Sequence, residues 1–139
     1  MKYEKITSYI KIFSDSYSAG DWIVGDRNGG KNERPVKIPF IKYDKSVFDF
    51  MRDMHGFMDN RCEETLSIYG VDIDELGEAD IDVSQADDKE VIALITYVIR
   101  SERFCDGKLK NAVESGKITN WLRRLEELDS IETVLTNVV

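Results

Sequence analysis

The fold is decided by residues 87–103, DDKEVIALITYVIRSER. Asp87 followed three positions later by Glu90 is a capping pair typical of a helix start. From Val91 to Ile99 apolar side chains cover more than half of the helix circumference, and a helix with so wide an apolar surface is usually buried among other elements. We therefore predict a central helix over about residues 87–103, with the other elements packed around it.

Shorter amphipathic patterns on both sides of this stretch predict the helices that cover it. Asp106 is the expected N-cap of a short helix that follows the central one and ends before Gly116. The other expected helices have apolar residues at steps of three and four, and they cover residues 2–14, 44–58, 60–69 and 117–129.

One pair of strands is expected among these helices. Asp21–Val24 and Val36–Tyr43 have strand-like composition, and Asn28-Gly29-Gly30 between them marks a turn. Pro39 has no backbone N–H, so the second strand should lie at a sheet edge or carry a bulge. Because an isolated two-stranded hairpin is only marginally stable, we expect this one to pack against the helices.

The expected fold class is α+β and mostly helical, with helices packed around the central apolar helix (about 87–103) and a small β-hairpin (about 21–43). A length of 139 residues is common for one domain, so residues 1–139 should form a single globular domain. Residues 130–139 are a docked strand, an oligomer contact or a flexible tail. The expected core holds large apolar side chains: Trp22, Phe40, Phe48, Met51, Leu94, Ile95, Val98, Phe104, Trp121 and Leu125.

The net charge of −8 is concentrated in the second half of the chain. Residues 1–70 are neutral in sum, and nine carboxylates with a single lysine lie between Asp72 and Glu90. Such a surface repels phosphate backbones and anionic lipid, which argues against nucleic-acid or membrane binding and suits a basic protein partner. The partner-binding candidates are carboxylates of this segment: Asp72, Asp74, Glu75, Glu78, Asp80 and Asp82.

The location of the protein is expected to be cytoplasmic. No window approaches the roughly 18 uninterrupted apolar residues of a membrane span. Charges recur through Lys11, so the N-terminus lacks the apolar core of a signal peptide. Cys62 and Cys105 are then expected to be free thiols in a reducing compartment.

The pentapeptide Arg103-Phe104-Cys105-Asp106-Gly107 stands between two expected helices and is the candidate functional or structural motif. In a functional role, Arg103 and the helix start that follows would favour the reactive thiolate of Cys105. In a structural role, which we favour, Cys105 packs inward beside Phe104, Asp106 caps the helix and Arg103 pairs with a distant carboxylate.

Two other patterns resemble metal sites, and both are incomplete. Between Asp72 and Val83 several positions match a calcium loop, but Leu76 and Val83 stand where oxygen ligands are needed. His55 and Cys62 supply two ligands, whereas a zinc site takes at least three from the protein. We therefore expect no metal and no cofactor.

Several segments carry a likeness in order and spacing to a known family: Tyr9–Phe13, Gly20–Trp22, Pro39–Tyr43, Val91–Arg100, Arg103–Gly107, Leu109, Gly116, Ile118 and Leu122–Leu128. In these segments the chain resembles a family of small bacterial and phage-associated proteins of unknown function. The resemblance implies one intact intracellular domain, and it supplies no reaction, ligand or catalytic residue. Lys108 departs from the family pattern, which often has an apolar residue there.

Three functions remain open. The leading hypothesis is a non-enzymatic protein-interaction or regulatory module, which binds a partner through the acidic segment 72–90 or the apolar C-terminal tail, residues 130–139. The second is a small enzyme, for example a hydrolase, with a cleft near Arg103, Cys105 and Asp106. The third is an acidic protein that mimics nucleic acid. No catalytic residue is assigned, because a single histidine weakens Ser/His and Cys/His schemes.

Overall fold

A computed structural model describes residues 2–14, 16–26, 37–75 and 81–138 of the chain. The described elements confirm the mostly helical α+β class with one antiparallel hairpin. No helix in these ranges is long and apolar enough to cross a membrane. In chain order the elements are α1 (Glu4–Thr7), η1 (Ser8–Ile10), β1 (Gly20–Asp26), β2 (Lys37–Tyr43), α2 (Lys45–Met54), η2 (His55–Phe57), α3 (Cys62–Ile68), η3 (Ile73–Glu75), α4 (Asp88–Ser101), α5 (Lys108–Glu114) and α6 (Lys117–Val138).

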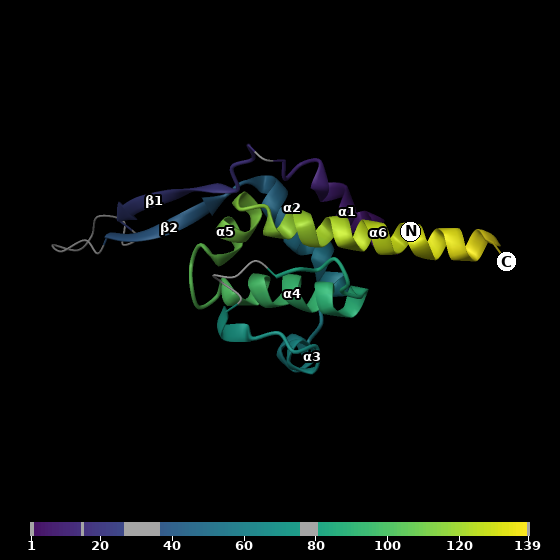
Figure 1. The fold of residues 1–139 in the computed structure, drawn as a ribbon. Helices are drawn as coiled ribbons and strands as arrows, with labels where there is room; N and C mark the ends of the chain where they lie inside the picture. The colour runs from purple at the N-terminus through teal and green to yellow at the C-terminus, as the bar shows by residue number, and fades with distance from the viewer. Residues whose placement is uncertain (1, 15, 27–36, 76–80, 139) are drawn as a thin grey trace.

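The central helix is confirmed as α4, which lies between α3 and α6 in Figure 1 and also packs against α5. The side chain of Asp87 accepts a hydrogen bond from the backbone N–H of Glu90 at 3.0 Å and caps the helix as predicted. Eight side chains of α4 are buried, an unbroken run from Val91 to Thr96 together with Val98 and Ile99. The wide apolar surface in the sequence therefore corresponds to contacts on several sides.

The two ends of the chain differ from expectation. The helix expected over residues 2–14 is limited to α1 and η1, although Ile6 and Phe13 are buried as its apolar pattern requires. At the other end, α6 continues to Val138, so the strand considered for residues 130–139 is wrong. The backbone N–H of Tyr3 donates to the buried carboxylate of Asp129 at 2.9 Å and joins the two ends.

Tyrosine–carboxylate hydrogen bonds connect elements that are distant in the sequence. Five tyrosine hydroxyls donate in this way. Each bond couples a largely apolar ring to a charged acceptor, so packing and hydrogen bonding are combined in one side chain. The pairs are Tyr3 with Asp88 at 2.5 Å, Tyr9 with Asp53 at 2.6 Å, Tyr17 with Asp44 at 2.5 Å, Tyr69 with Asp87 at 2.5 Å, and Tyr43 with Glu102.

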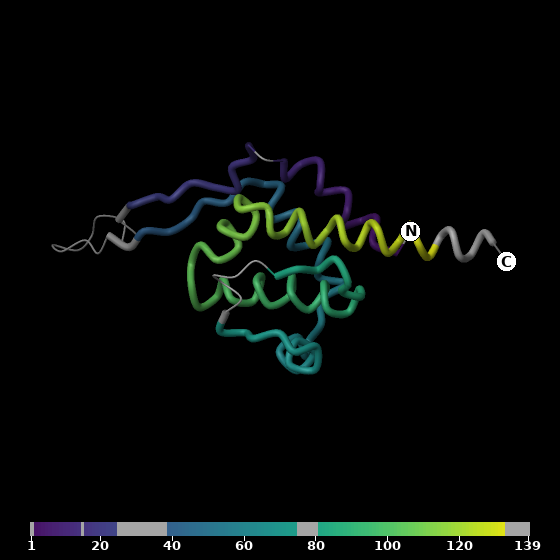
Figure 2. Tube along the Cα trace, in the orientation of Figure 1, coloured from purple at the N-terminus to yellow at the C-terminus, as the bar shows by residue number. Residues whose placement is uncertain are grey.

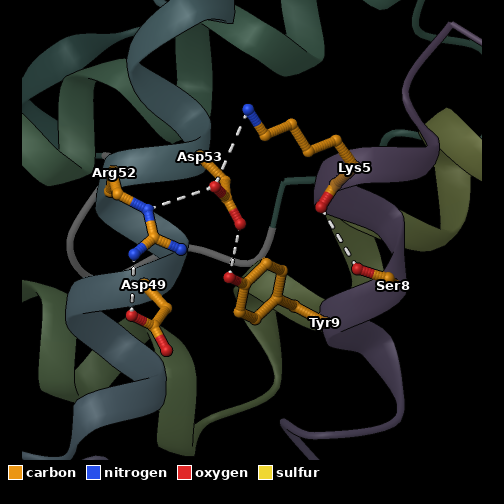
Figure 3. A network of polar contacts seen from close by, with 6 residues as sticks. All are labelled: Lys5, Ser8, Tyr9, Asp49, Arg52 and Asp53. Carbon is orange, nitrogen blue, oxygen red and sulfur yellow. Dashed lines mark hydrogen bonds and ion pairs between the residues drawn. The ribbon is translucent and has the colours of Figure 1, made fainter.

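Asp53 is the centre of the network that holds η1 and α1 against α2 (Figure 3). Its carboxylate accepts from the Tyr9 hydroxyl, and it lies 3.8 Å from Nζ of Lys5 and 3.4 Å from Nε of Arg52. The hydrogen bond from Tyr9 lowers the pKa of Asp53 below its ordinary value of 3.8. Burial and the same bond raise the pKa of Tyr9 to about 12. The pair is therefore stabilised as a phenol and an ionised carboxylate.

The β1–β2 hairpin projects from the helical body, as the tube in Figure 2 shows. Gly20 pairs with Tyr43, and Trp22 pairs with Ile41. Only glycine fits the first of these positions, because a Cβ on Gly20 would lie 2.6 Å from the carbonyl oxygen of Lys42. Each strand is an edge strand of this two-stranded sheet, which accommodates Pro39 as predicted. The expected turn at Asn28–Gly30 lies outside the described residues.

The expected core is partly wrong. Leu94, Ile95, Val98, Trp121 and Leu125 are buried, and Phe40 and Met51 are half-buried.

The three aromatic residues Trp22, Phe48 and Phe104 are instead exposed, at 49%, 55% and 92%. Trp22 belongs to the projecting hairpin, and Phe104 lies in the loop between α4 and α5. Phe48 lies beside the buried face of α2, which is formed by Val47, Phe50 and Met54.

We predict that Tyr9→Phe lowers the free energy of unfolding by about 1 kcal/mol at neutral pH, since it removes one hydrogen bond to a charged group. A lowered carboxylate pKa contributes stability above the unfolded-state value, and this contribution is lost as the pH falls through the folded-state pKa. The difference between wild type and variant should therefore shrink as the pH falls below the ordinary aspartate pKa of 3.8 and through the lowered pKa of Asp53. Urea unfolding of the wild type and the variant at neutral and at acidic pH measures this difference in stability.

Tyr97→Phe is the matched control, because the Tyr97 hydroxyl has no hydrogen bond to any described residue. It should change the stability little at either pH. A Tyr9→Phe deficit of equal size at neutral and acidic pH would contradict the role assigned to the ionised carboxylate of Asp53.

Candidate functional site

The predicted motif forms the loop that joins α4 to α5, and its geometry depends on Glu102. The Glu102 carboxylate accepts hydrogen bonds from the backbone N–H of Gly107 at 2.9 and 3.0 Å and of Leu109 at 3.4 Å. The Tyr43 hydroxyl of β2 donates to the same carboxylate. Glu102 therefore ties the end of α4 to the start of α5 and to the base of the hairpin.

The prediction that Asp106 caps the next helix is wrong. Gly107 occupies the N-cap position of α5 with a φ of 101°, a backbone conformation that favours glycine. The carboxylate that satisfies the first N–H groups comes from Glu102. The sequence signal was misread because Asp106 is adjacent to the helix, whereas Glu102 reaches the same groups across the turn.

The structural reading of the motif is also corrected. Arg103, Phe104, Cys105 and Asp106 are exposed, and only Gly107 is buried. Cys105 therefore does not pack inward beside Phe104. Arg103 pairs with no carboxylate among the described residues. All four side chains of the motif are thus available to solvent and to ligands.

Residues of the loop line two grooves. The first, which we call the thiol groove, has a volume of about 530 Å³ and is lined by Asp74, Tyr97, Cys105 and Asp106, among others. The second, which we call the arginine groove, has a volume of about 750 Å³ and is lined in part by the residues His55, Arg100 and Arg103.

The grooves therefore divide the motif, with Arg103 on one side and Cys105 with Asp106 on the other. The imidazole of His55 belongs to the arginine groove. Among the described residues, the thiol groove has no histidine that could act as a base for Cys105. The catalytic pairing needed for a Cys/His mechanism is not assembled there.

His55 and Cys62 do not share a helix, because α2 ends at Met54 and α3 begins at Cys62. Cys62 is buried, and burial raises the pKa of its thiol despite the nearby Arg100 guanidinium. The described part of the chain contains no cluster of three histidine, cysteine or acidic residues able to hold a metal ion. Part of the calcium-loop pattern, residues 76–80, lies outside the described ranges.

Asp72, Asp74 and Asp82 of the acidic segment are exposed, whereas Asp88 and Glu90 at its end are half-buried. Asp72 accepts from the backbone N–H of Asp74 at 3.0 Å, and Asp82 accepts from that of Ser84 at 2.9 Å. The bonds to Ser84 lower the pKa of Asp82. These carboxylates stabilise local turns and still present their charge to solvent. Three of the predicted partner-binding candidates, Glu75 (its side chain), Glu78 and Asp80, are outside the described part.

The exposed rings of Trp22, Phe48 and Phe104 form a set that we call the aromatic surface. A Cβ on Gly107 would lie 3.0 Å from the Trp22 ring and 3.6 Å from the Ile41 side chain, so the hairpin rests on the motif loop. Phe48 contacts Tyr43 with ring centroids 6.2 Å apart, and Tyr43 bonds to Glu102. The aromatic surface therefore borders the motif, a relation that apolar composition alone did not reveal.

Residues 72–130 match the model of a family of unknown function (DUF6508). The matched segment begins just before η3 and includes α4, the motif loop, α5 and α6 as far as Ser130. No curated protein and no solved structure matches the chain. The family likeness covers the motif and assigns it no reaction or ligand.

We predict that Gly107→Ala destabilises the protein by about 2 kcal/mol, since a non-glycine residue at positive φ is strained and its Cβ would press on Trp22. Gly56→Ala is the matched control, because a Cβ there meets nothing within 4 Å and the φ is not positive. Thermal and urea unfolding compare the two. Equal effects of both substitutions would contradict the tight contact at Gly107.

We predict that one thiol reacts quickly with a chromogenic disulfide reagent in the folded protein, and that the second reacts only after unfolding. Cys105 is exposed and Cys62 is buried, so the fast reaction should vanish in Cys105→Ser. Slow reaction of both thiols in the folded state would contradict the exposure of Cys105. A fast phase that persists in Cys105→Ser would contradict the burial of Cys62.

Proposed function

We propose that the chain is a non-enzymatic protein-interaction module that binds a basic protein partner. The observation that carries the proposal is the exposure of the aromatic surface next to the motif loop. Large aromatic side chains are enriched among the residues that dominate binding energy, so exposed aromatic rings beside one loop mark a candidate interaction site.

Phe104 has the features of an anchor residue. Its side chain is 92% exposed at the tip of a loop whose backbone is fixed by Glu102. Because the loop is held in place before binding, inserting Phe104 into a partner pocket costs less conformational entropy than it would from a mobile loop. Trp22 presents a second ring from the hairpin, which packs on Gly107.

The charge of the neighbouring segment favours a basic partner. The thiol groove extends from Ile73 and Asp74 to Gly107, where Trp22 packs. A partner that covers Phe104 and Trp22 can therefore also reach the exposed carboxylates of Asp72 and Asp74. Electrostatic complementarity of this kind raises association rates and selects against acidic partners. A cytoplasmic location and a bacterial or phage-associated origin belong to the same proposal.

We predict that Phe104→Ser reduces capture of a specific partner from bacterial host lysate at least about tenfold, as expected for a hot-spot aromatic residue. Ile68→Ser is the matched control, because Ile68 is an apolar side chain on α3 that is 84% exposed and lies outside the aromatic surface. Quantitative mass spectrometry of the captured proteins at low salt measures both variants.

The salt dependence of partner capture distinguishes the contribution of the acidic segment from that of the aromatic surface. Capture that weakens between about 0.1 M and about 1 M salt supports a contribution of the acidic segment to binding. Over that range the Debye screening length shortens from about 10 Å to about 3 Å, so attraction between exposed charges is reduced. Equal loss of the captured protein in Phe104→Ser and Ile68→Ser, or loss in neither, would contradict binding through the aromatic surface.

A small enzyme, for example a hydrolase, is the second candidate, supported by the exposure of Cys105 and Asp106 in the thiol groove. It requires a thiol that reacts faster at neutral pH than free cysteine does. The rate of the fast phase in the thiol-labelling experiment therefore distinguishes an activated nucleophile from an ordinary exposed cysteine.

A further inference from the structure

The arginine groove is lined by none of the three residues of the aromatic surface and contains a different chemistry. It lies between the η2 turn that follows α2 and the C-terminal end of α4. Its volume of about 750 Å³ is within the range of small-molecule sites. The proposed protein interaction does not use its lining residues.

Arg100 is held in a fixed orientation at one side of this groove. Its two terminal nitrogens donate to the backbone oxygen and to the side-chain Oδ1 of Asn60, both at 3.1 Å. A guanidinium has five N–H donors, so donors remain for a ligand after the two bonds to Asn60 and the contact with the Cys62 thiol. The charge is therefore oriented by the protein before any ligand arrives.

Arg103 adds a second cation in the same groove. Its backbone N–H bonds to the carbonyl of Arg100 at 3.2 Å, which continues the helical turn, and its side chain pairs with no described carboxylate. Glu102 is the one carboxylate among the described lining residues, and its oxygens accept from Gly107, Leu109 and Tyr43. The groove is thus lined by two arginines and one acidic residue, whose carboxylate already has other partners.

The remaining wall is apolar. Met51, Met58 and Ile99 line it, and methionine side chains adapt to ligands of different shape. His55 adds a ring with hydrogen-bonding nitrogens at the edge of the same groove. Cations beside an apolar wall fit a molecule that joins an anionic group to an apolar body.

We propose that the arginine groove binds a small organic anion, in which a carboxylate accepts hydrogen bonds from Arg100 and Arg103. The apolar body of the ligand packs against Met51, Met58 and Ile99. Guanidinium groups bind carboxylates through paired N–H donors, and this geometry distinguishes a carboxylate from a neutral group of the same shape.

The test titrates 1-naphthoate into the full chain, prepared without a histidine tag, and follows the ring protons of His55 by NMR at constant pH. His55 is the single histidine of the chain, so its signals are identified without further assignment. We expect a saturable shift with a dissociation constant of roughly 1 mM, which is typical of a ligand of this size. The neutral analogue 1-naphthamide should bind at least about tenfold more weakly.

Arg103→Gln should weaken naphthoate binding at least about tenfold, since it removes one of the two cations. Arg123→Gln is the matched control, because Arg123 is an exposed arginine of α6 that does not line the groove. It should leave the affinity unchanged.

Three results would overturn the proposal: no saturable shift of His55, equal affinity for the carboxylate and the amide, or equal affinity of Arg103→Gln and wild type. The comparison of the two ligands uses the unmodified protein, so the proposal stays testable even if Arg103→Gln does not fold.

Discussion

Burial of α4 is the constraint on which the other elements depend. Eight of its fourteen residues are buried, so α3, α5 and α6 must cover it on several sides. Covering α4 with α5 requires the chain to reverse immediately after Ser101, and this reversal takes place at the molecular surface. Glu102 is used to stabilise the turn, while the following side chains, from Arg103 to Asp106, remain exposed. The packing of the core thus determines which residues of the motif are accessible.

Hydrogen bonds from tyrosine hydroxyls to carboxylates join distant segments of this acidic chain. Neutral phenols donate to Asp44, Asp53, Asp87, Asp88 and Glu102. A phenol satisfies a carboxylate without cancelling its charge, whereas an exposed ion pair would cancel the charge and contribute little stability. In a chain with a net charge of −8, these carboxylates can therefore join separate segments without one basic residue for each of them. Because the tyrosine donors are neutral, they stabilise the tertiary structure without adding positive charge.

The sequence predicts features that depend on local pattern and misses those that depend on distant contacts. The extent of α4, its Asp87 cap and the two strands follow from periodicity and capping chemistry. The exposure of Trp22 and Phe48 depends on how far the hairpin and α2 extend from the core, which hydrophobicity does not encode. The cap supplied by Glu102 and the meeting of His55 with Arg103 in one groove likewise arise only when separate elements pack together.

The segment that matches the family, residues 72–130, does not contain all of the elements that pack against α4. Three tyrosine bonds cross its N-terminal boundary at residue 72, from Tyr3, Tyr43 and Tyr69 to acceptors in or next to α4. The α3 helix, which packs on α4, also precedes residue 72. Residues 72–130 are therefore not an exchangeable module: transplanted alone, they would leave one side of α4 without a neighbour. Any relative that shares only this segment must have evolved a different layer to shield it from water.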